Sequence, residues 1–271
     1  MQSKSSFNAA ELKARFNPEG SPLRRQQMVM LEMAQVLDAI CTKHNIPYML
    51  YGGTLLGAVR HGGFIPWDDD FDVALLRKDY KRLMEVLPKE LPDHIALQTN
   101  DTDKNYYYFY AKLRDRNSFL DEGLYDHPFK ERGIFIDIFP LDRLWPFIHR
   151  MSFQSYAFTL IRKDKSCSEK TMRKIRLLTW VNRHFTFPVL RAFCKITGGN
   201  KPLMLDLGIP FHLEYNINDV FPLGRCQFEN TSFPVPANCS NMLTDMYGDY
   251  MKLPDDLDHV YHHVEKLEFF D

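Results

Sequence analysis

Cysteine and long hydrophobic runs are scarce in this sequence, and each shortage excludes a class of protein. The 271 residues include only five cysteines, widely spaced and without a C-x-x-C pair, so neither a disulfide framework nor a zinc ribbon is indicated. No stretch approaches the ~20 uninterrupted apolar residues of a membrane span, and residues 1–20 lack the apolar core of a signal peptide. We therefore expect a soluble, cytoplasmic protein with buried free thiols.

The sequence also has almost no net charge. Its 34 lysines and arginines nearly balance its 35 aspartates and glutamates, so no whole-molecule field favours nucleic acid or an acidic polymer as a partner. Hydrophobic residues make up 45% of the chain, which is enough for a full core around one catalytic unit with appendages. Any electrostatic function must therefore reside in local clusters.

Hydrophobic periodicity predicts a mixture of helices and strands, and hence an α/β or α+β fold. The expected strands cover residues 48–51, 73–76, 95–98, 106–114 and 133–140, and the expected helices cover 22–44, 54–60, 78–87 and 242–247. Thr54 is expected to cap the second of these helices, and Pro88 to end the third. Residues 151–199 are expected to be helical with a break at Pro188.

Four aspartates, Asp68, Asp69, Asp70 and Asp72, lie within five positions. Like charges this close raise one another's pKa unless a cation offsets them, and dense carboxylates suit Mg²⁺ or Mn²⁺. In an extended chain Asp68, Asp70 and Asp72 share one face, whereas Asp69 points to the other. Alternation with Phe71 singles out Asp70 and Asp72 as the sharpest pair. The alternative is a solvated acidic loop that caps the preceding turn.

Two further features support metal-assisted phosphoryl chemistry. Asp137 is alone in an otherwise apolar strand, where an ionised carboxylate requires a partner, so a third metal-binding carboxylate is the better interpretation. Gly52 and Gly53 precede an expected helix, where backbone N–H groups can approach an anion closely. A phosphate-binding turn and a metal-binding strand thus follow each other within some twenty residues.

The string YGGTLLGAVRHGGFIPWDDDFDV at residues 51–73 resembles the signature of the LicD family. This family includes bacterial phosphocholine transferases and is related to the fukutin-type ribitol-phosphate transferases. Similar family features recur at residues 110–115, 136–142 and 247–254. The resemblance implies a nucleotidyltransferase-like mixed sheet with flanking helices. It implies one catalytic domain over residues 1–271, with its core at about 22–142 and 203–271 and a basic helical insertion at about 146–200.

The resemblance also implies roles for the site residues. Gly52 and Gly53 would form the phosphate-binding turn, and Asp70, Asp72 and Asp137 would be the catalytic residues and the ligands of Mg²⁺ or Mn²⁺. The implied reaction transfers a phospho-alcohol, such as phosphocholine, from a CDP-activated donor to a hydroxyl of a cell-surface glycan or its lipid-linked precursor, as in lipopolysaccharide biosynthesis. Asp137 either accepts the proton of the attacking hydroxyl or serves only as a ligand.

Several other side chains are candidate donor contacts. Thr54 follows the glycine turn, and Arg60 and His61 either contact the donor phosphate or occupy a helix C-terminus that the dipole favours. Lys112 and Arg114 alternate along an expected strand, which makes them candidates for the diphosphate oxygens or residues of an exposed strand face.

Aromatic residues are a further candidate feature. Trp67 and the run at 106–110 either pack in the core or stack on a base or a quaternary ammonium group.

The segment between Arg143 and Lys201 holds thirteen basic residues and two acidic ones, with apolar residues interleaved. This composition predicts either a peripheral contact with the inner face of an anionic membrane, next to a lipid-linked glycan, or a solvated helical insertion. Two rival functions remain at this point. One is a nucleotidyltransferase that attaches a nucleotide monophosphate to a small acceptor, and the other is a non-catalytic glycan- or nucleotide-binding homologue.

Overall fold

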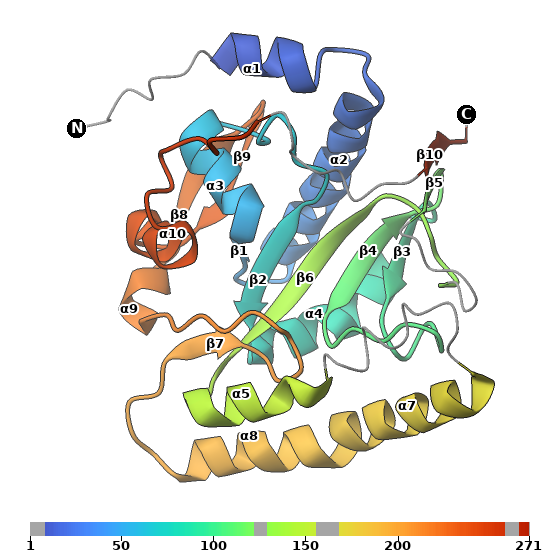
Figure 1. Cartoon of the computed structure of the whole chain (residues 1–271), viewed down its shortest axis with the longest axis vertical. Helices are drawn as coiled ribbons and strands as arrows, with labels where there is room; N and C mark the ends of the chain where they lie inside the picture. Colours follow the sequence, from blue (N-terminus) through green and yellow to red (C-terminus); the bar gives the residue numbers. More distant parts are fainter. Residues whose placement is uncertain (1–8, 122–128, 156–167, 258–265, 271) are drawn as a thin grey trace.

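A mixed sheet forms the centre of the protein (Figure 1), seen here in a computed structural model that describes residues 9–121, 129–155, 168–257 and 266–270. The strands lie in the order β1-β2-β6-β4-β3, and β7 pairs with the C-terminal part of β6. Only β2 and β6 pair in parallel among these strands, and the other pairs are antiparallel. The strands are β1 (Met49–Leu50), β2 (Asp72–Leu76), β3 (Ile95–Gln98), β4 (Ala111–Asp115), β6 (Phe135–Arg143) and β7 (Leu203–Leu205).

Two long helices, α2 (Pro22–Lys43) and α4 (Arg77–Glu90), pack against one face of this sheet and enclose the main hydrophobic core. The hydroxyl of Ser21 caps α2 by accepting from the amide of Arg24 at 3.2 Å, and Pro22 suits the first helical turn. The opposite face is covered by a second apolar cluster that includes Phe139, Leu205 and Tyr215. Charged side chains lie at the ends of the central strands, between the apolar layers on the two faces of the sheet.

The remaining elements surround this core. The helices are α1 (Ala9–Phe16), α3 (Gly52–His61), α5 (Pro146–Ser152), α7 (Glu169–Val181), α8 (Phe187–Ile196), α9 (Ile217–Val220) and α10 (Cys239–Tyr247), with a π-helical turn η1 (Asn182–Thr186). Two antiparallel pairs complete the fold, β5 (Ser118–Asp121) with β10 (Lys266–Phe269) and β8 (Gly224–Phe228) with β9 (Thr231–Val235). The predicted mixture of helices around a mixed sheet is therefore confirmed.

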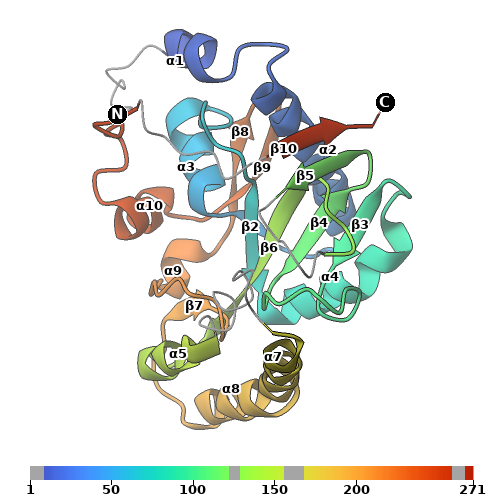
Figure 2. The same ribbon diagram turned by 45° about the vertical axis from the view of Figure 1, so that its right-hand side comes forward.

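Helices α7 and α8 follow one another below the sheet as one nearly continuous rod (Figure 1), and Figure 2 shows the two helices at the bottom of the molecule. The predicted break at Pro188 is wrong, because this proline lies in the first turn of α8, where its missing N–H costs little. The helical continuity runs through η1 instead. Within the described part of the chain, no helix is both long enough and apolar enough to cross a membrane.

Two other boundaries differ from expectation. The helix predicted to end at Pro88 continues to Glu90, with Leu91 donating to the carbonyl of Leu87, whose side chain is buried. The strand predicted over 106–114 begins only at Ala111. The aromatic run before it packs upon itself and on Phe129 rather than entering the sheet.

Candidate functional site

Asp72 and Asp137 lie side by side at one end of the parallel pair β2 and β6. Asp72 is the first residue of β2 and is the direct register partner of Asp137 in β6. The amide of Asp137 donates to the carbonyl of Phe71 at 2.8 Å, which fixes this register at the strand entrance. The residues that follow Asp72 in β2 and Asp137 in β6 have their apolar side chains buried on the two faces of the sheet. The two acids therefore lie where the hydrophobic core ends and the site begins.

The other three aspartates lie in the loop that leads into β2. Carboxylate oxygens of Asp68, Asp69 and Asp70 come within 4.8 Å of one another. The expected separation of Asp69 onto the opposite face is therefore wrong, because the extended ladder begins only at Asp72 and the preceding residues follow a loop. Together with Asp72 and Asp137, these three aspartates form a cluster of five carboxylates, which we call the acid cluster.

Two buried glutamines of α2 hold the acidic loop in place. Gln26 donates to the carbonyl of Asp69 at 2.7 Å, and Gln27 donates to the carbonyl of Asp68 at 2.9 Å. Both glutamines are almost fully buried, and the bonds that they donate to the acidic loop go to its backbone carbonyls rather than to its carboxylates. The sequence interpretation missed these residues, although two adjacent glutamines on the core-facing side of an amphipathic helix are a usable signal.

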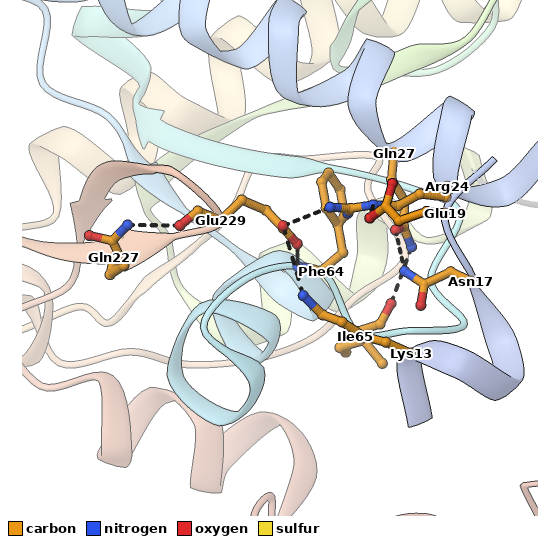
Figure 3. Close-up of polar contacts among 9 residues, drawn as sticks. All are labelled: Lys13, Asn17, Glu19, Arg24, Gln27, Phe64, Ile65, Gln227 and Glu229. Carbon is orange, nitrogen blue, oxygen red and sulfur yellow. Dashed lines mark hydrogen bonds and ion pairs between the residues drawn. The ribbon is translucent and has the colours of Figure 1, made fainter. Parts of the chain in front are cut away.

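Glu229 fixes the same loop from the other side (Figure 3). Its carboxylate accepts from the amide of Phe64 at 3.2 Å and pairs with Arg24 at 3.0 Å. Burial tends to raise the pKa of Glu229, but hydrogen bonding and charge from Arg24, with a contribution from Lys13, outweigh it and the pKa is lowered. A Cβ on Gly63 would approach this carboxylate to 2.3 Å, so glycine is needed there.

The glycine turn lies directly against the acid cluster. A Cβ at Gly52 would meet the Oδ2 atom of Asp72 at 2.7 Å, and one at Gly53 would meet the Oδ2 atom of Asp68 at 2.8 Å. Gly52 also has a φ of +55°, a conformation that side chains disfavour. Helix α3 begins at Gly52 itself, so its N-terminus faces the carboxylates. The gap between them is too small for any side chain larger than the hydrogen atom of glycine.

Thr54 does not cap α3, contrary to expectation. Its hydroxyl accepts from the amide of Asp72 at 2.8 Å, and the residue at the cap position, Tyr51, makes no side-chain capping bond. Thr54 is almost fully buried, so it joins α3 to the start of β2 rather than presenting its hydroxyl to a donor.

Burial and mutual repulsion shift the titration of the acids. The pKa of Asp68 is raised well above its usual value by burial and by the charges of Asp70 and Asp69. The pKa of Asp72 is likewise raised by burial and by Asp70, Asp137 and Asp68, and Lys112 opposes this shift. A cluster that resists full ionisation in this way fits an additional cation.

Lys112 and Arg114 have different roles despite sharing one strand face. The Nζ atom of Lys112 lies 2.8 Å from Oδ1 of Asp137, and its side chain is 3% exposed, so it is part of the site. Arg114 is fully buried and donates to Gln98 at 2.8 Å and to the carbonyl of Gly133 at 2.9 Å. The expectation that Arg114 reaches donor phosphates is therefore not supported, because these donors point into the protein.

Arg60 and His61 end α3 beside the chain that follows α10. The guanidinium of Arg60 donates to the carbonyls of Tyr250 and Lys252 at 2.8 and 3.1 Å, and its Nε donates to His61 at 2.9 Å. Burial, followed by the charges of Arg60 and Lys13, lowers the pKa of His61 to about 3, so the imidazole is neutral at physiological pH. A direct contact of this pair with donor phosphate stays a prediction.

Aromatic side chains border the acid cluster. The pKa of Tyr247, the last residue of α10, is raised by burial and by the negative charges of Asp72, Asp68 and Asp70. Tyr51 also neighbours Asp72, and its hydroxyl lies 2.8 Å from that of Tyr215. Tyr247 and Tyr215 were not predicted as site residues, although Tyr247 begins the family-like segment at 247–254.

Of the aromatic residues that were predicted, most pack internally. Trp67 lies edge-on to Phe16 and His61 and is largely buried. Tyr108 and Tyr110 have ring centres 5.0 Å apart and flank the ammonium of Lys112 at 5.6 and 5.8 Å. Tyr108 and Tyr110 thus border the site at Lys112, and burial followed by the charge of Asp137 raises the pKa of Tyr106 in the same run.

Comparison with known proteins identifies the family of this chain. Residues 45–192 match the family described as LicD/FKTN/FKRP, nucleotidyltransferase domain. The chain is 30% identical over 263 residues to the lipopolysaccharide cholinephosphotransferase LicD of Haemophilus influenzae, which covers 90% of this chain and 97% of that protein. A stretch of 48 residues is 42% identical to the human ribitol 5-phosphate transferase FKRP, covering 18% of this chain and 10% of that protein. The chain therefore belongs to the LicD/FKTN/FKRP family and is a phosphotransferase.

Proposed function

We propose that the protein transfers a phospho-alcohol, phosphocholine or a similar group, from a CDP-activated donor to a hydroxyl of a cell-surface glycan or its lipid-linked precursor. The observation that carries the proposal is the acid cluster packed against the glycine turn, with Asp72 and Asp137 in direct register and with carboxylate oxygens so close to Gly52 and Gly53 that a Cβ at either glycine would collide with them. The names of the relatives, a cholinephosphotransferase and a ribitol 5-phosphate transferase, support the same reaction class.

The chemistry of the cluster fits Mg²⁺ or Mn²⁺. These hard cations prefer carboxylate oxygens, and the raised pKa values of Asp68 and Asp72 indicate a charge density that a divalent cation would offset. Asp70, Asp72 and Asp137 would hold the ion, with Asp68 beside them. When bound, the ion would stabilise negative charge on the donor diphosphate.

The remaining roles belong to the protein's own residues. The acceptor hydroxyl loses its proton to water, and its oxygen forms a new bond to the phosphorus that carries the alcohol. The bond from this phosphorus to the bridging oxygen of the diphosphate breaks, and CMP leaves with that oxygen. Gly52 and Gly53 let the carboxylates of Asp72 and Asp68 lie against the start of α3, whose N-terminus would attract the diphosphate beside them. Lys112 lies 2.8 Å from Asp137, and an ion pair with lysine makes a carboxylate a weaker proton acceptor, so we assign Asp137 the role of ligand rather than base.

A donor screen tests the proposal. The protein is incubated with CDP-choline, CDP-ribitol, CTP or ATP and Mg²⁺, and the released nucleotide is identified. Release of CMP from a CDP-alcohol is the expected result. Pyrophosphate from CTP or ATP would instead identify a nucleotidyltransferase, and no release would favour a binding homologue.

Variants of the cluster test the metal assignment. Asp72→Asn is expected to lower turnover by at least about 100-fold and to abolish thermal stabilisation by Mg²⁺. Asp93→Asn, at an exposed acid remote from the cluster, is the matched control and should retain both. Full activity and full Mg²⁺ stabilisation in a folded Asp72→Asn protein would remove the metal assignment.

The proposal also includes a peripheral contact between the α7–α8 rod and an anionic membrane. Large apolar side chains along the rod are exposed, among them Val189 at 65% and Ile196 at 83%. Exposed basic residues, including Arg173 and Lys174, lie on the same rod. Apolar and basic side chains together are the composition of a helix that lies in a membrane interface.

Vesicle binding tests this contact. Neutralising Arg173, Lys174 and Arg176 together is expected to weaken co-sedimentation with phosphatidylglycerol vesicles, and Ile196→Ser should do so without changing charge. Unchanged binding of both variants would contradict the membrane contact and leave the rod as a solvated insertion. Residues 156–167, which hold three of the thirteen basic residues of this segment, lie outside the described residues.

A further inference from the structure

A second charged cavity lies at the opposite ends of β2 and β6 from the acid cluster. It has a volume of about 910 Å³, within the size range of sites for small ligands. Leu76 and Leu141, at the distal ends of β2 and β6, line it, together with parts of α4, β7 and α8. Since β2 runs from Asp72 to Leu76 with a rise of about 3.3 Å per residue, roughly 13 Å of strand separates the two sites. We call this feature the distal cavity.

The lining of the distal cavity is strongly basic although the whole chain is nearly neutral. Its eight cationic residues are Arg77, Lys78, Lys81, Arg143, Arg183, Arg191, Lys195 and Lys201. Asp142 is the one carboxylate among the residues that line it. The cations come from α4, β6, η1, α8 and the segment before β7. These elements are far apart in the sequence but lie on the same side of the molecule (Figure 1).

Three of the arginines pair with carboxylates that are not among the lining residues. Arg77 and Arg191 both pair with Asp206, whose side chain is 4% exposed, and the Arg191 contact is 3.0 Å long. Arg183 pairs with Asp101. These ion pairs hold the arginine side chains in place in the wall of the cavity. The eight cations still exceed the three carboxylates, Asp142, Asp206 and Asp101, by five positive charges.

Four cations are not neutralised in this way. Among the described residues, the side chains of Lys78, Lys81, Arg143 and Lys195 make no ion pair or hydrogen bond, and all four residues are exposed. They converge from three separate elements, α4, β6 and α8, on one concave surface. Like charges brought together by the fold repel one another unless an anion offsets them, which is the same physical argument that assigns a cation to the acid cluster.

The apolar part of the lining suits the ring of a ligand whose charged groups contact these cations. Leu141, Leu203 and Pro188 contribute apolar surface to the cavity, and Cys194 is buried beneath it. The exposed apolar side chains proposed to contact a membrane, such as Val189 and Ile196, are not among the lining residues. The distal cavity is therefore a surface of its own rather than part of that face.

We infer that the distal cavity is a binding site for a saccharide that carries two or more phosphate groups. The flexible ammonium groups of Lys78, Lys81 and Lys195 and the planar guanidinium of Arg143 bind phosphate oxygens, and the apolar lining contacts the sugar ring. The inference deepens the proposed function, because it makes the acceptor a phosphorylated glycan that the protein holds by its phosphates at a distance from the reacting hydroxyl.

The test uses glucose 1,6-bisphosphate as the probe, with EDTA present so that the acid cluster holds no metal. Calorimetry is expected to show binding of the bisphosphate, weaker binding of inorganic phosphate and none of glucose. Lys81→Met combined with Arg143→Met should weaken bisphosphate binding by at least about tenfold. Lys174→Met, which removes an exposed lysine outside the cavity, is the matched control and should bind normally.

Other outcomes overturn the inference. Absence of bisphosphate binding, or equal binding by the double variant, would contradict it. So would loss of phosphatidylglycerol vesicle binding in the double variant without any bisphosphate binding, since that would assign these cations to a lipid surface. The Asp72→Asn variant should bind the bisphosphate normally while losing CDP-alcohol cleavage. Failure of this inference is thus distinguishable from failure of the proposed function.

Discussion

Replacing Gly52 by alanine isolates the close approach between the glycine turn and the acid cluster. The added Cβ would lie 2.7 Å from Oδ2 of Asp72, so the carboxylate has to retreat by about 0.7 Å to reach an ordinary contact of 3.4 Å. A displacement of this size at a reacting centre is expected to lower turnover by about 100-fold. The positive φ of 55° adds a strain of roughly 1–2 kcal/mol to the folded state.

Gly62→Ala is the matched control for this prediction. Gly62 has a φ of +70° and would have no atom within 4 Å of its Cβ, so it carries similar backbone strain without touching the acids. Both variants should lose about 2–4 °C of melting temperature per kcal/mol of strain. Only Gly52→Ala should lose Mg²⁺-dependent CMP release per folded molecule. Equal turnover of the two variants would refute the argument that the glycine turn shapes the site.

Three further predictions concern charged residues around the site. Lys112→Met removes the cation that lowers the pKa of Asp72, so the acidic limb of the pH–activity profile should move to higher pH; an unmoved limb would contradict the coupling. Arg114→Met should cost about 1–3 kcal/mol of stability in urea unfolding, because it leaves Gln98 and a carbonyl unpaired, but should preserve activity per folded molecule. Glu229→Gln should destabilise the protein by roughly 1.5–3 kcal/mol near neutral pH. The pKa of Glu229 is lowered from 4.5 in the folded state, so this difference should be complete above pH 4.5 and should be lost as the pH falls from 4.5 through the lower folded-state pKa; a pH-independent difference would contradict it.

Patterns with strong local causes were predictable. The helix over 22–44, the strand over 95–98 and the helix that ends at Gly248 follow from apolar periodicity and from glycine and proline signals, and the structure confirms all three. The aromatic run at 106–110 was predicted as strand because tyrosine and phenylalanine favour strands. Its rings find partners in one another and in Phe129, which lies about twenty residues away and is invisible to a local pattern.

The alternating pair Lys112 and Arg114 marks the limit of local pattern reasoning at the site. The alternation of polar and apolar residues correctly placed both side chains on one face of β4. The groups that surround this face differ between the two positions. Lys112 meets Asp137 across the sheet, whereas Arg114 is enclosed by Gln98 and Gly133. Periodicity reports direction within an element, and burial depends on the neighbours that other elements provide.

The sequence by itself determined the chemistry of this protein. Four aspartates close together, a glycine pair before a helix and a lone aspartate in an apolar strand are local features, so residue type and spacing sufficed to predict an acid cluster beside a glycine turn. Only the tertiary structure decided which residues share a surface. The direct register of Asp72 with Asp137, the support of the loop by Gln26 and Gln27, and the basic lining of the distal cavity all join segments that are distant along the chain. Such contacts depend on how the elements pack, and a one-dimensional pattern does not contain that information.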